Sequence, residues 1–158
     1  MRRVVLFVCT GNICRSPMAQ ALFNATAQRA GDAEVLVACS AGTWAQENLP
    51  ASGHALTALA ERGINLQNHR GHTITRQDLA DAAVVIVMTR SHRDALGAEF
   101  PECRPKLHLM SELKDRLFDI DDPYGGTLAD YRETAQQLQE LIESGYAKVK
   151  SWALDDPR

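Results

Sequence analysis

The sequence lacks an apolar run long enough to cross a membrane. Its first apolar stretch, residues 4–8, is followed at once by polar residues, whereas a spanning helix needs about 20 apolar residues. The same stretch is too short for the apolar core of a signal peptide, although Arg2 and Arg3 precede it. We therefore expect a cytoplasmic protein with no membrane partner.

The chain also lacks an excess of positive charge. Its 17 Lys and Arg residues are balanced by 20 Asp and Glu residues, for a formal net charge of -3, and the basic residues are scattered along the chain. Proteins that bind nucleic acids usually gather Lys and Arg into a patch. This balance excludes nucleic acid as the expected partner.

Cysteine is scarce. The four cysteines are Cys9, Cys14, Cys39 and Cys103. Two disulfides would be the expected arrangement in an exported protein, but stable disulfides are rare in the cytoplasm. Free thiols and cysteine chemistry are therefore the better interpretation.

No linker rich in Pro, Gly or Ser, no internal repeat and no low-complexity tract divides the 158 residues. With 45% hydrophobic residues, the chain is large enough for one core and too short for two comfortable ones. We expect a single domain over residues 1–158 and favour a monomer.

The sequence does contain an alternation of strand and helix patterns. Strands are expected at residues 3–8, 34–39, 83–88 and 106–110, and helices from about Ser16 onward and at residues 51–62, 91–97 and 128–148. This order predicts an α/β fold, a single three-layer domain with a four-stranded parallel sheet and helices on both faces. Ligands bind at the carboxyl ends of such strands, and a phosphate-binding loop is expected there, after the first strand.

That loop is the segment Cys9-Thr-Gly-Asn-Ile-Cys-Arg-Ser16. A loop of this length can aim several backbone N–H groups at one anion, helped by the helix N-terminus and the Arg15 guanidinium. The same positive surroundings favour the thiolate of Cys9, the form that attacks phosphorus. The expected phosphate-binding residues are Thr10, Gly11, Asn12, Ile13, Cys14, Arg15 and Ser16.

A plainer interpretation of Cys9 competes with this one. A cysteine at a strand end is usually an apolar filler, and its spacing from Arg15 occurs by chance in many proteins. Here the motif follows a predicted strand and opens a predicted helix, which is the setting that the chemistry needs. We therefore predict an anion-binding thiolate site.

Four segments together resemble the low-molecular-weight protein tyrosine phosphatase family, and the resemblance spans nearly the whole chain. They are Val8-Cys-Thr-Gly-Asn-Ile-Cys-Arg-Ser-Pro-Met-Ala19, Ser40-Ala-Gly42, His69-Arg70 and Asp122-Pro-Tyr124. The resemblance implies a phosphatase acting on a phosphoprotein through a phosphocysteine on Cys9. It assigns Arg15 as the phosphate clamp and Asp122 as the general acid and base. Ser16 would donate to the Cys9 sulfur and ease its departure.

The acid role of Asp122 depends on the resemblance. By composition alone, the acidic residues before Pro123 are more typical of a solvated turn. The acidic run also lacks the glycine and glutamate spacing of a calcium loop, and a thiolate mechanism needs no metal. We predict no metal and no cofactor.

The resemblance also implies supporting residues. Asn12, Ser16, Ser40 and His69 would form a hydrogen-bonded network that holds the loop, although His69 alone is equally typical of a surface loop.

The substrate rim would contain Ile13, Trp44 and Tyr124, where an aromatic ring would stack on the substrate ring. The alternative for Trp44 is a partly exposed loop tryptophan with no such role.

Cys14 would form a reversible disulfide with Cys9 and so protect Cys9 from irreversible oxidation. The alternative is that Cys14 is a small packing residue. Cys39 and Cys103 are expected to be structural.

Tyrosine is the favoured substrate residue. Ile13 offers bulk and no hydrogen-bond partner, which suits an aromatic ring better than a guanidinium. The stretches 88–92 and 122–128 nevertheless look like the protein arginine phosphatase branch of the family, which is the alternative. A thioredoxin-coupled arsenate reductase is less favoured because Cys103 has no neighbouring thiol in sequence, and a non-catalytic phosphate-binding module would need neither Cys9 nor Asp122.

Overall fold

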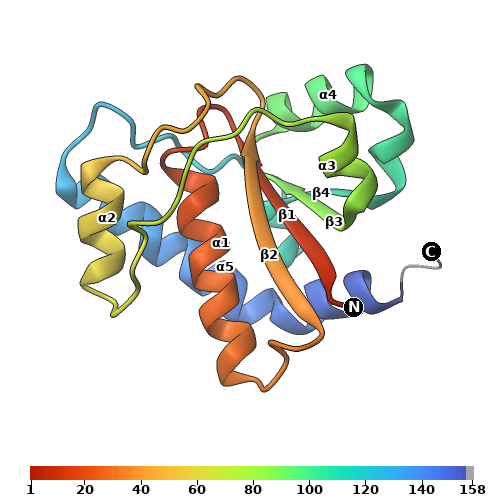
Figure 1. Cartoon of the computed structure of the whole chain (residues 1–158), viewed down its shortest axis with the longest axis horizontal. Helices are drawn as coiled ribbons and strands as arrows, with labels where there is room; N and C mark the ends of the chain where they lie inside the picture. Colours follow the sequence, from red (N-terminus) through yellow and green to blue (C-terminus); the bar gives the residue numbers. More distant parts are fainter. Residues whose placement is uncertain (156–158) are drawn as a thin grey trace.

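A parallel sheet of four strands forms the centre of the computed structural model, which describes residues 1–155. The strands are β1 (Arg3–Cys9), β2 (Leu36–Gly42), β3 (Ala82–Val87) and β4 (Leu107–Leu109). They lie in the order β2-β1-β3-β4, and every pair is parallel (Figure 1). The predicted α/β class and the four-stranded parallel sheet are confirmed.

Helices cover both faces of this sheet. The helices are α1 (Arg15–Arg29), α2 (Gly53–Ala60), α3 (Arg76–Asp81), α4 (Arg90–Glu99) and α5 (Leu128–Leu154). Figure 1 shows α1, α2 and α5 on one side of the strands and α3 and α4 on the other. Two separate apolar clusters result, because alternate β1 side chains such as Phe7 and Val8 pack into opposite layers.

Several element boundaries differ from the predicted ones. The second strand begins at Leu36 and not at residue 34, because the N–H groups of Val35 and Leu36 both donate to the Asp32 carbonyl in a turn. It continues to Gly42, whose N–H donates to the His72 carbonyl at 2.8 Å. Gly42 and His72 are 30 residues apart, so the local pattern does not reveal the end of this strand.

Other elements are shorter or longer than predicted, and one helix was not predicted. The last strand is only Leu107–Leu109, because the 3-10 helices η1 (Pro101–Lys106) and η2 (Met110–Lys114) flank it. Helix α5 runs six residues further than expected, to Leu154. Helix α3 was not predicted, although Thr75 and Asp78 form a capping box at its start.

The fold brings three strand ends to one edge. In the parallel ladders Cys9 pairs with Gly42, and Val8 pairs with Val87. The strand order reverses beside β1, since β2 lies on one side of it and β3 on the other. Cys9 therefore lies at the carboxyl edge next to the reversal, where open α/β sheets bind ligands.

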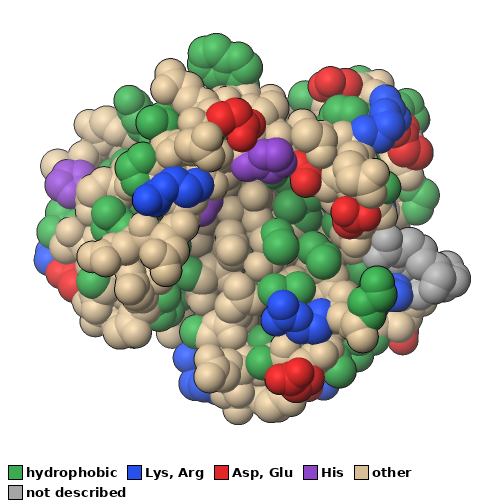
Figure 2. All heavy atoms as spheres, viewed as in Figure 1, with side chains coloured by type: hydrophobic (Ala, Val, Ile, Leu, Met, Phe, Trp, Pro, Cys, Tyr) green, Lys and Arg blue, Asp and Glu red, His purple; other side chains and the backbone are tan. Residues whose placement is uncertain are grey.

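The surface shows no grouping of one charge on the face in Figure 2, where Lys and Arg side chains are interspersed with Asp and Glu. Within residues 1–155, no helix is both long enough and apolar enough to span a bilayer.

Candidate active site

The segment after β1 turns back on itself before α1 begins. Asn12 adopts a left-handed backbone conformation with φ of 57°, which Asn tolerates better than most residues. Helix α1 then starts at Arg15, and no side chain caps its N-terminus. The first N–H groups of this helix are therefore available to an anion.

Hydrogen bonds from outside the loop fix the direction of its first peptide groups. The N–H groups of Thr43 and Trp44 donate to the carbonyls of Cys9 and Thr10, at 2.8 and 3.0 Å. No described peptide bond is cis, and in a trans peptide the N–H points opposite to the C=O. The N–H groups of Thr10 and Gly11 therefore point into the loop.

The second half of the loop is fixed in the same way. His69 Nε2 donates to the Asn12 carbonyl at 2.6 Å, and the N–H of Ser52 donates to the Ile13 carbonyl at 2.9 Å. The N–H groups of Ile13 and Cys14 therefore also point inward. Together the four peptide groups form a cradle of the kind that binds phosphate.

His69 suits this role as a neutral donor. A carbonyl only accepts, so the hydrogen of the ring must be on Nε2. Burial lowers the pKa of His69, and the hydrogen bond to Asn12 opposes that effect only in part. The ring is therefore neutral near pH 7 and bears its single hydrogen on Nε2.

The Asn12 side chain connects the loop to its surroundings. Its Nδ2 donates to Ser16 Oγ at 2.8 Å and to Ser40 Oγ at 3.0 Å, and its Oδ1 accepts from the N–H of His72 at 3.0 Å. Ser40 in turn donates to Gln20 Oε1 at 2.6 Å. Asn12 itself is fully buried, so these bonds satisfy an amide that would otherwise destabilise the loop.

Cys9 and Ser16 meet inside the loop. Their Sγ and Oγ atoms lie 3.0 Å apart. Because Asn12 Nδ2 already donates to Ser16 Oγ, the Ser16 proton is available for the sulfur or for the Ala41 carbonyl, which is further away at 3.4 Å. The shorter distance favours the sulfur, and a hydroxyl in that position stabilises a thiolate.

Gly42 allows the loop to lie against the end of β2. A Cβ atom at this position would overlap the Thr10 carbonyl oxygen and approach the Asn12 Cβ to 3.1 Å. Any larger residue would displace the cradle. The glycine of the Ser40-Ala-Gly42 segment is therefore a structural requirement of the site.

Arg15 presents one edge of its guanidinium to the site. Its Nη1 donates to the Ile120 carbonyl at 2.8 Å, and its Nη2 lies 3.5 Å from Asp122 Oδ2. Its Nε is buried and has no partner in the described part of the chain. The Nε–Nη2 edge has the two parallel N–H groups with which an arginine is able to bind two oxygens of one anion.

Asp122 is brought to the loop by the tertiary structure. Its side chain is 48% exposed, whereas that of Arg15 is 5% exposed. Its Oδ1 accepts from the N–H of Tyr124 at 3.0 Å, which holds the turn. The predicted acid thus lies beside the predicted clamp, at the mouth of the site.

A pocket of about 320 Å³ opens above Cys9. Trp44 and Tyr124, which are 80% and 68% exposed, lie at its rim together with half-buried Ile13. Residues lining the pocket are Cys9, Thr10, Gly11, Ile13, Cys14, Arg15, Trp44, Gln46, Leu49, Asp122 and Tyr124. The three predicted rim residues are therefore in one place, and Gln46 and Leu49 join them without having been predicted.

Cys14 is buried at the back of the loop. Its Sγ lies 3.3 Å from the Tyr131 hydroxyl and 3.6 Å from Ser52 Oγ. Burial raises the pKa of the Cys14 thiol, and it raises that of Tyr131 to about 12. Tyr131 is buried on α5, and sequence analysis did not identify its hydroxyl contact with the loop.

A second polar contact to the loop was also missed. Thr10 Oγ1 lies 2.8 Å from Nε2 of buried His92, at the start of α4. The stretch 88–92 was noted in the sequence only for its likeness to one branch of a family. The contact joins residues 82 positions apart, so local periodicity carried no signal for it.

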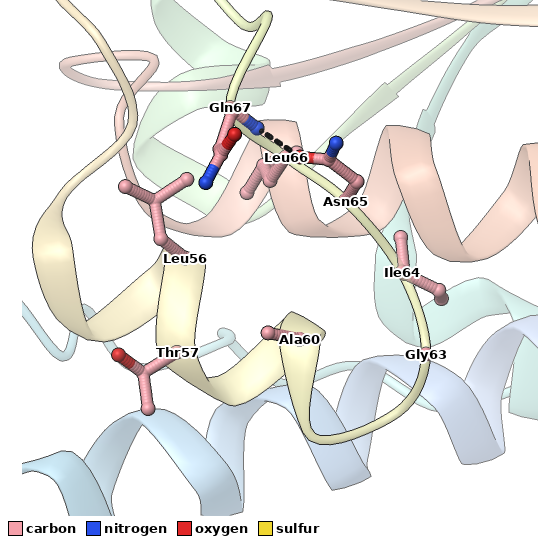
Figure 3. Close-up of a pocket in the computed structure, with 8 residues that line it drawn as sticks. All are labelled: Leu56, Thr57, Ala60, Gly63, Ile64, Asn65, Leu66 and Gln67. Atoms are coloured by element: carbon pink, nitrogen blue, oxygen red, sulfur yellow. Dashed lines mark hydrogen bonds between the residues drawn. The ribbon is translucent and has the colours of Figure 1, made fainter.

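A separate cavity of about 400 Å³ lies between α2 and the segment after it (Figure 3). Leu56, Thr57 and Ala60 line it from the helix, and residues 63–67 line it from the loop. None of these side chains is ionisable or nucleophilic. This cavity therefore offers no candidate nucleophile, acid or base comparable with those in the pocket at Cys9.

The remaining cysteines lie outside the site. All four cysteines are free, and buried Cys103 lies 4.0 Å from the Leu96 carbonyl, in the layer of α4. Among residues 1–155, no group of three or more His, Cys, Asp or Glu side chains has an arrangement suited to a metal ion.

Known proteins are similar to this chain in sequence and in fold. A family model described as low molecular weight phosphotyrosine protein phosphatase matches residues 4–152. The chain is 40% identical to a protein-arginine-phosphatase of Bacillus subtilis (strain 168), over 92% of this chain and 96% of that relative. It superposes with a TM-score of 0.88 on a low molecular weight protein tyrosine phosphatase from T. tengcongensis, at 40% identity over 92% of this chain and 99% of that one.

A second similar structure is that of the arginine phosphatase YwlE, in a cysteine-to-serine mutant whose active-site serine is phosphorylated. It superposes with a TM-score of 0.88 at 35% identity and covers 93% of this chain and 95% of that one.

Proposed function

Because the chain belongs to the low molecular weight phosphotyrosine protein phosphatase family, we propose that it hydrolyses phosphotyrosine in proteins through a phosphocysteine on Cys9. The protein is a phosphatase, a hydrolase of phosphoric monoesters, and the proposal concerns its residue roles and its substrate. The observation that carries the choice of tyrosine is Ile13, an aliphatic side chain in the wall of the pocket over Cys9.

In the first step the Cys9 thiolate attacks phosphorus, and the bond from phosphorus to the leaving oxygen breaks. The inward N–H groups and Arg15 hold the three other phosphate oxygens as charge shifts among them. Asp122, protonated, gives its proton to the leaving oxygen. Its place next to Arg15, 3.5 Å away, supports this role.

In the second step water attacks the phosphocysteine. The Asp122 carboxylate takes a proton from the water, and the bond from phosphorus to sulfur breaks. The electron pair returns to the Cys9 sulfur, where the Ser16 hydroxyl at 3.0 Å stabilises the thiolate. Inorganic phosphate leaves, and the enzyme is ready for another cycle.

The pocket wall supports an aromatic substrate. Ile13, Leu49, Trp44 and Tyr124 surround the opening with apolar surface, which packs against the faces of a phenyl ring. A guanidinium carries several N–H donors that need acceptors when they are desolvated. The Ile13 side chain offers no such acceptor in the pocket wall.

Phosphoarginine is the second candidate. The Bacillus subtilis relative with 40% identity is a protein-arginine-phosphatase, and exposed acceptors such as Gln46 and Asp122 also line the pocket. These side chains are able to accept hydrogen bonds from a guanidinium at the mouth.

A side-by-side measurement of kcat/KM on matched phosphotyrosyl and phosphoarginyl peptides separates the two candidates. We expect the phosphotyrosyl peptide to react faster, and Ile13→Thr to shift the ratio toward phosphoarginine by about 10-fold or more, because it exchanges apolar contact for a hydrogen-bond partner. The matched control is Ile64→Thr, which is remote from Cys9. A wild-type preference for phosphoarginine would reject the tyrosine assignment while leaving Cys9 chemistry intact.

Redox control by Cys14 is a further part of the proposal. Cys14 lies in the same loop as Cys9, and both line the pocket, so an oxidised Cys9 has a thiol in its own loop with which to form a disulfide. After mild peroxide, mass spectrometry should find a disulfide between Cys9 and Cys14 that dithiothreitol reverses. A Cys14→Ser variant should instead lose activity irreversibly, and equal recovery of both proteins would argue against the guard role.

A cytoplasmic location fits this chemistry, because Cys9 must be reduced to act and all four cysteines are free. Cell fractionation with an antibody against the chain tests the location directly.

A further inference from the structure

A buried histidine lies behind the phosphate loop and has no part in the steps above. His92 is the third residue of α4 and is 7% exposed. Its Nε2 lies 2.8 Å from Oγ1 of Thr10, the residue that follows the nucleophile and lines the pocket. This bond connects the layer of α4 with the loop.

Charged groups face His92 from two other parts of the chain. They are Arg15 at the start of α1 and the carboxylates of Asp119 and Asp122 in the segment before α5. Burial, and then Arg15, lower the pKa of His92 to about 4 against the opposing effect of the two carboxylates. The ring is therefore neutral at pH 7 and bears one hydrogen.

The position of that hydrogen follows from burial. His92 Nδ1 is buried and has no hydrogen-bond partner among residues 1–155. A buried N–H without an acceptor is rarer in proteins than an unpaired acceptor. The hydrogen therefore belongs on Nε2, which donates to Thr10 Oγ1, and the Thr10 hydroxyl proton stays free for another acceptor.

We propose that His92 is a positioning residue for phosphate transfer: it donates from Nε2 to Thr10 Oγ1 and so directs the Thr10 hydroxyl proton to a phosphate oxygen in the pocket. The same bond anchors the first turn of the loop, in which the Thr10 and Gly11 N–H groups point inward. The inference rests on phosphate transfer at Cys9, as proposed above, and holds whether the phosphate comes from tyrosine or arginine.

A double-mutant cycle on para-nitrophenyl phosphate tests the connection. We expect Thr10→Val and His92→Leu each to lower kcat/KM about 10-fold, as loss of one hydrogen bond would. The double variant should lose no more than either single variant, because both remove the same bond. His92→Gln retains an amide donor and should recover most of the loss, and His108→Leu, on β4, is the matched control with the wild-type rate.

The hydrogen position has its own measurement. Nitrogen-15 NMR of the imidazoles in the full chain near pH 7 should show a protonated Nε2 and an unprotonated Nδ1 for His92. The opposite tautomer would overturn the donor role. This readout does not depend on activity and is not expected from packing alone.

Other outcomes decide the proposal in the same way. Independent losses that multiply to about 100-fold in the double variant would overturn it, as would a His92→Leu protein with the wild-type rate. If His92→Leu does not fold, Thr10→Ser and Thr10→Val replace it, since Thr10 is exposed; retention of activity by Thr10→Val would overturn the proposal. If wild-type activity persists in Cys9→Ser, the proposed function and this inference fall together.

Discussion

At the scale of single residues, Arg15 and Asp122 differ in how firmly they are held. The Arg15 side chain is almost fully buried, and the Ile120 carbonyl fixes one of its nitrogens at 2.8 Å. Asp122 is 48% exposed and lies 3.5 Å from Arg15. Because the Asp122 carboxylate is half exposed and its distance to Arg15 is long for an ion pair, we expect it to turn toward a leaving group while Arg15 stays in place.

This arrangement predicts a leaving-group effect. Asp122→Asn keeps the size of the side chain but removes its proton donor, so kcat for phenyl phosphate should fall about 10²-fold or more. With para-nitrophenyl phosphate, whose leaving group needs little protonation, the decrease should be much smaller. Steady-state kinetics on the two esters measures the difference, with Asp121→Asn as the control, and equal losses would contradict the acid role.

At the scale of elements, the segment that bears Trp44 is tied to α3 through His72. The imidazole Nδ1 of His72 lies 3.3 Å from Glu47 Oε2, and its Nε2 lies 2.7 Å from Asp78 Oδ2. The backbone N–H of His72 donates to Asn12 Oδ1. Burial alone would lower the pKa of His72, but the two carboxylates outweigh that effect and raise it. The protonated ring therefore stabilises the connection between the rim of the pocket and the loop.

The raised pKa of His72 determines how its contribution to stability changes with pH. A raised pKa means that the contribution of His72 is fully present below its ordinary value near 6.5 and is lost as the pH rises through the folded value. His72→Gln should lower Tm more at pH 6 than at pH 8, by only about 1–3 °C because the ring is partly exposed. Thermal unfolding at fixed ionic strength measures this. Glu47→Gln should reduce the pH dependence, and a loss that is equal at both pH values would exclude the mechanism.

At the scale of the whole molecule, α5 contacts elements that are far apart along the chain. It packs on α1, on α2 and on η2, and its Tyr131 reaches the loop at Cys14. Its contact with η2 is close at Gly145, where a Cβ atom would lie 2.5 Å from the Leu113 Cβ. Backbone atoms of Leu113 are also near, so the contact has little room to relax.

Gly145→Ala should therefore destabilise the fold, although alanine is the better helix former. Overpacking of this kind costs about 1–3 kcal/mol of unfolding free energy, which urea denaturation measures. Gly53→Ala is the matched control, because nothing lies within 4 Å of its added Cβ at the start of α2, and it should change stability by less than about 1 kcal/mol. If the two variants are equally stable, the close contact does not limit the fold.

The sequence by itself determined the features whose parts are adjacent along the chain. The apolar strand, the loop from Cys9 to Ser16 and the helix after it follow from local patterns, and the structure places them as predicted. The alternation of strands and helices was sufficient for the parallel sheet. Helix α3 was missed, and some element ends were wrong, as at the end of β2, where a hydrogen bond to distant His72 sets the boundary.

Only the tertiary structure decided the contacts between distant segments. It placed Asp122 beside Arg15, Tyr131 against Cys14 and His92 against Thr10, and it revealed why Gly42 must lack a side chain. A hydrophobic pattern tells which side chains are buried, but it does not tell which polar atoms meet within the buried layers. That pairing depends on how the strand ends and helix ends come together in space, and it completes a site whose proposed nucleophile, Cys9, the local sequence had already indicated.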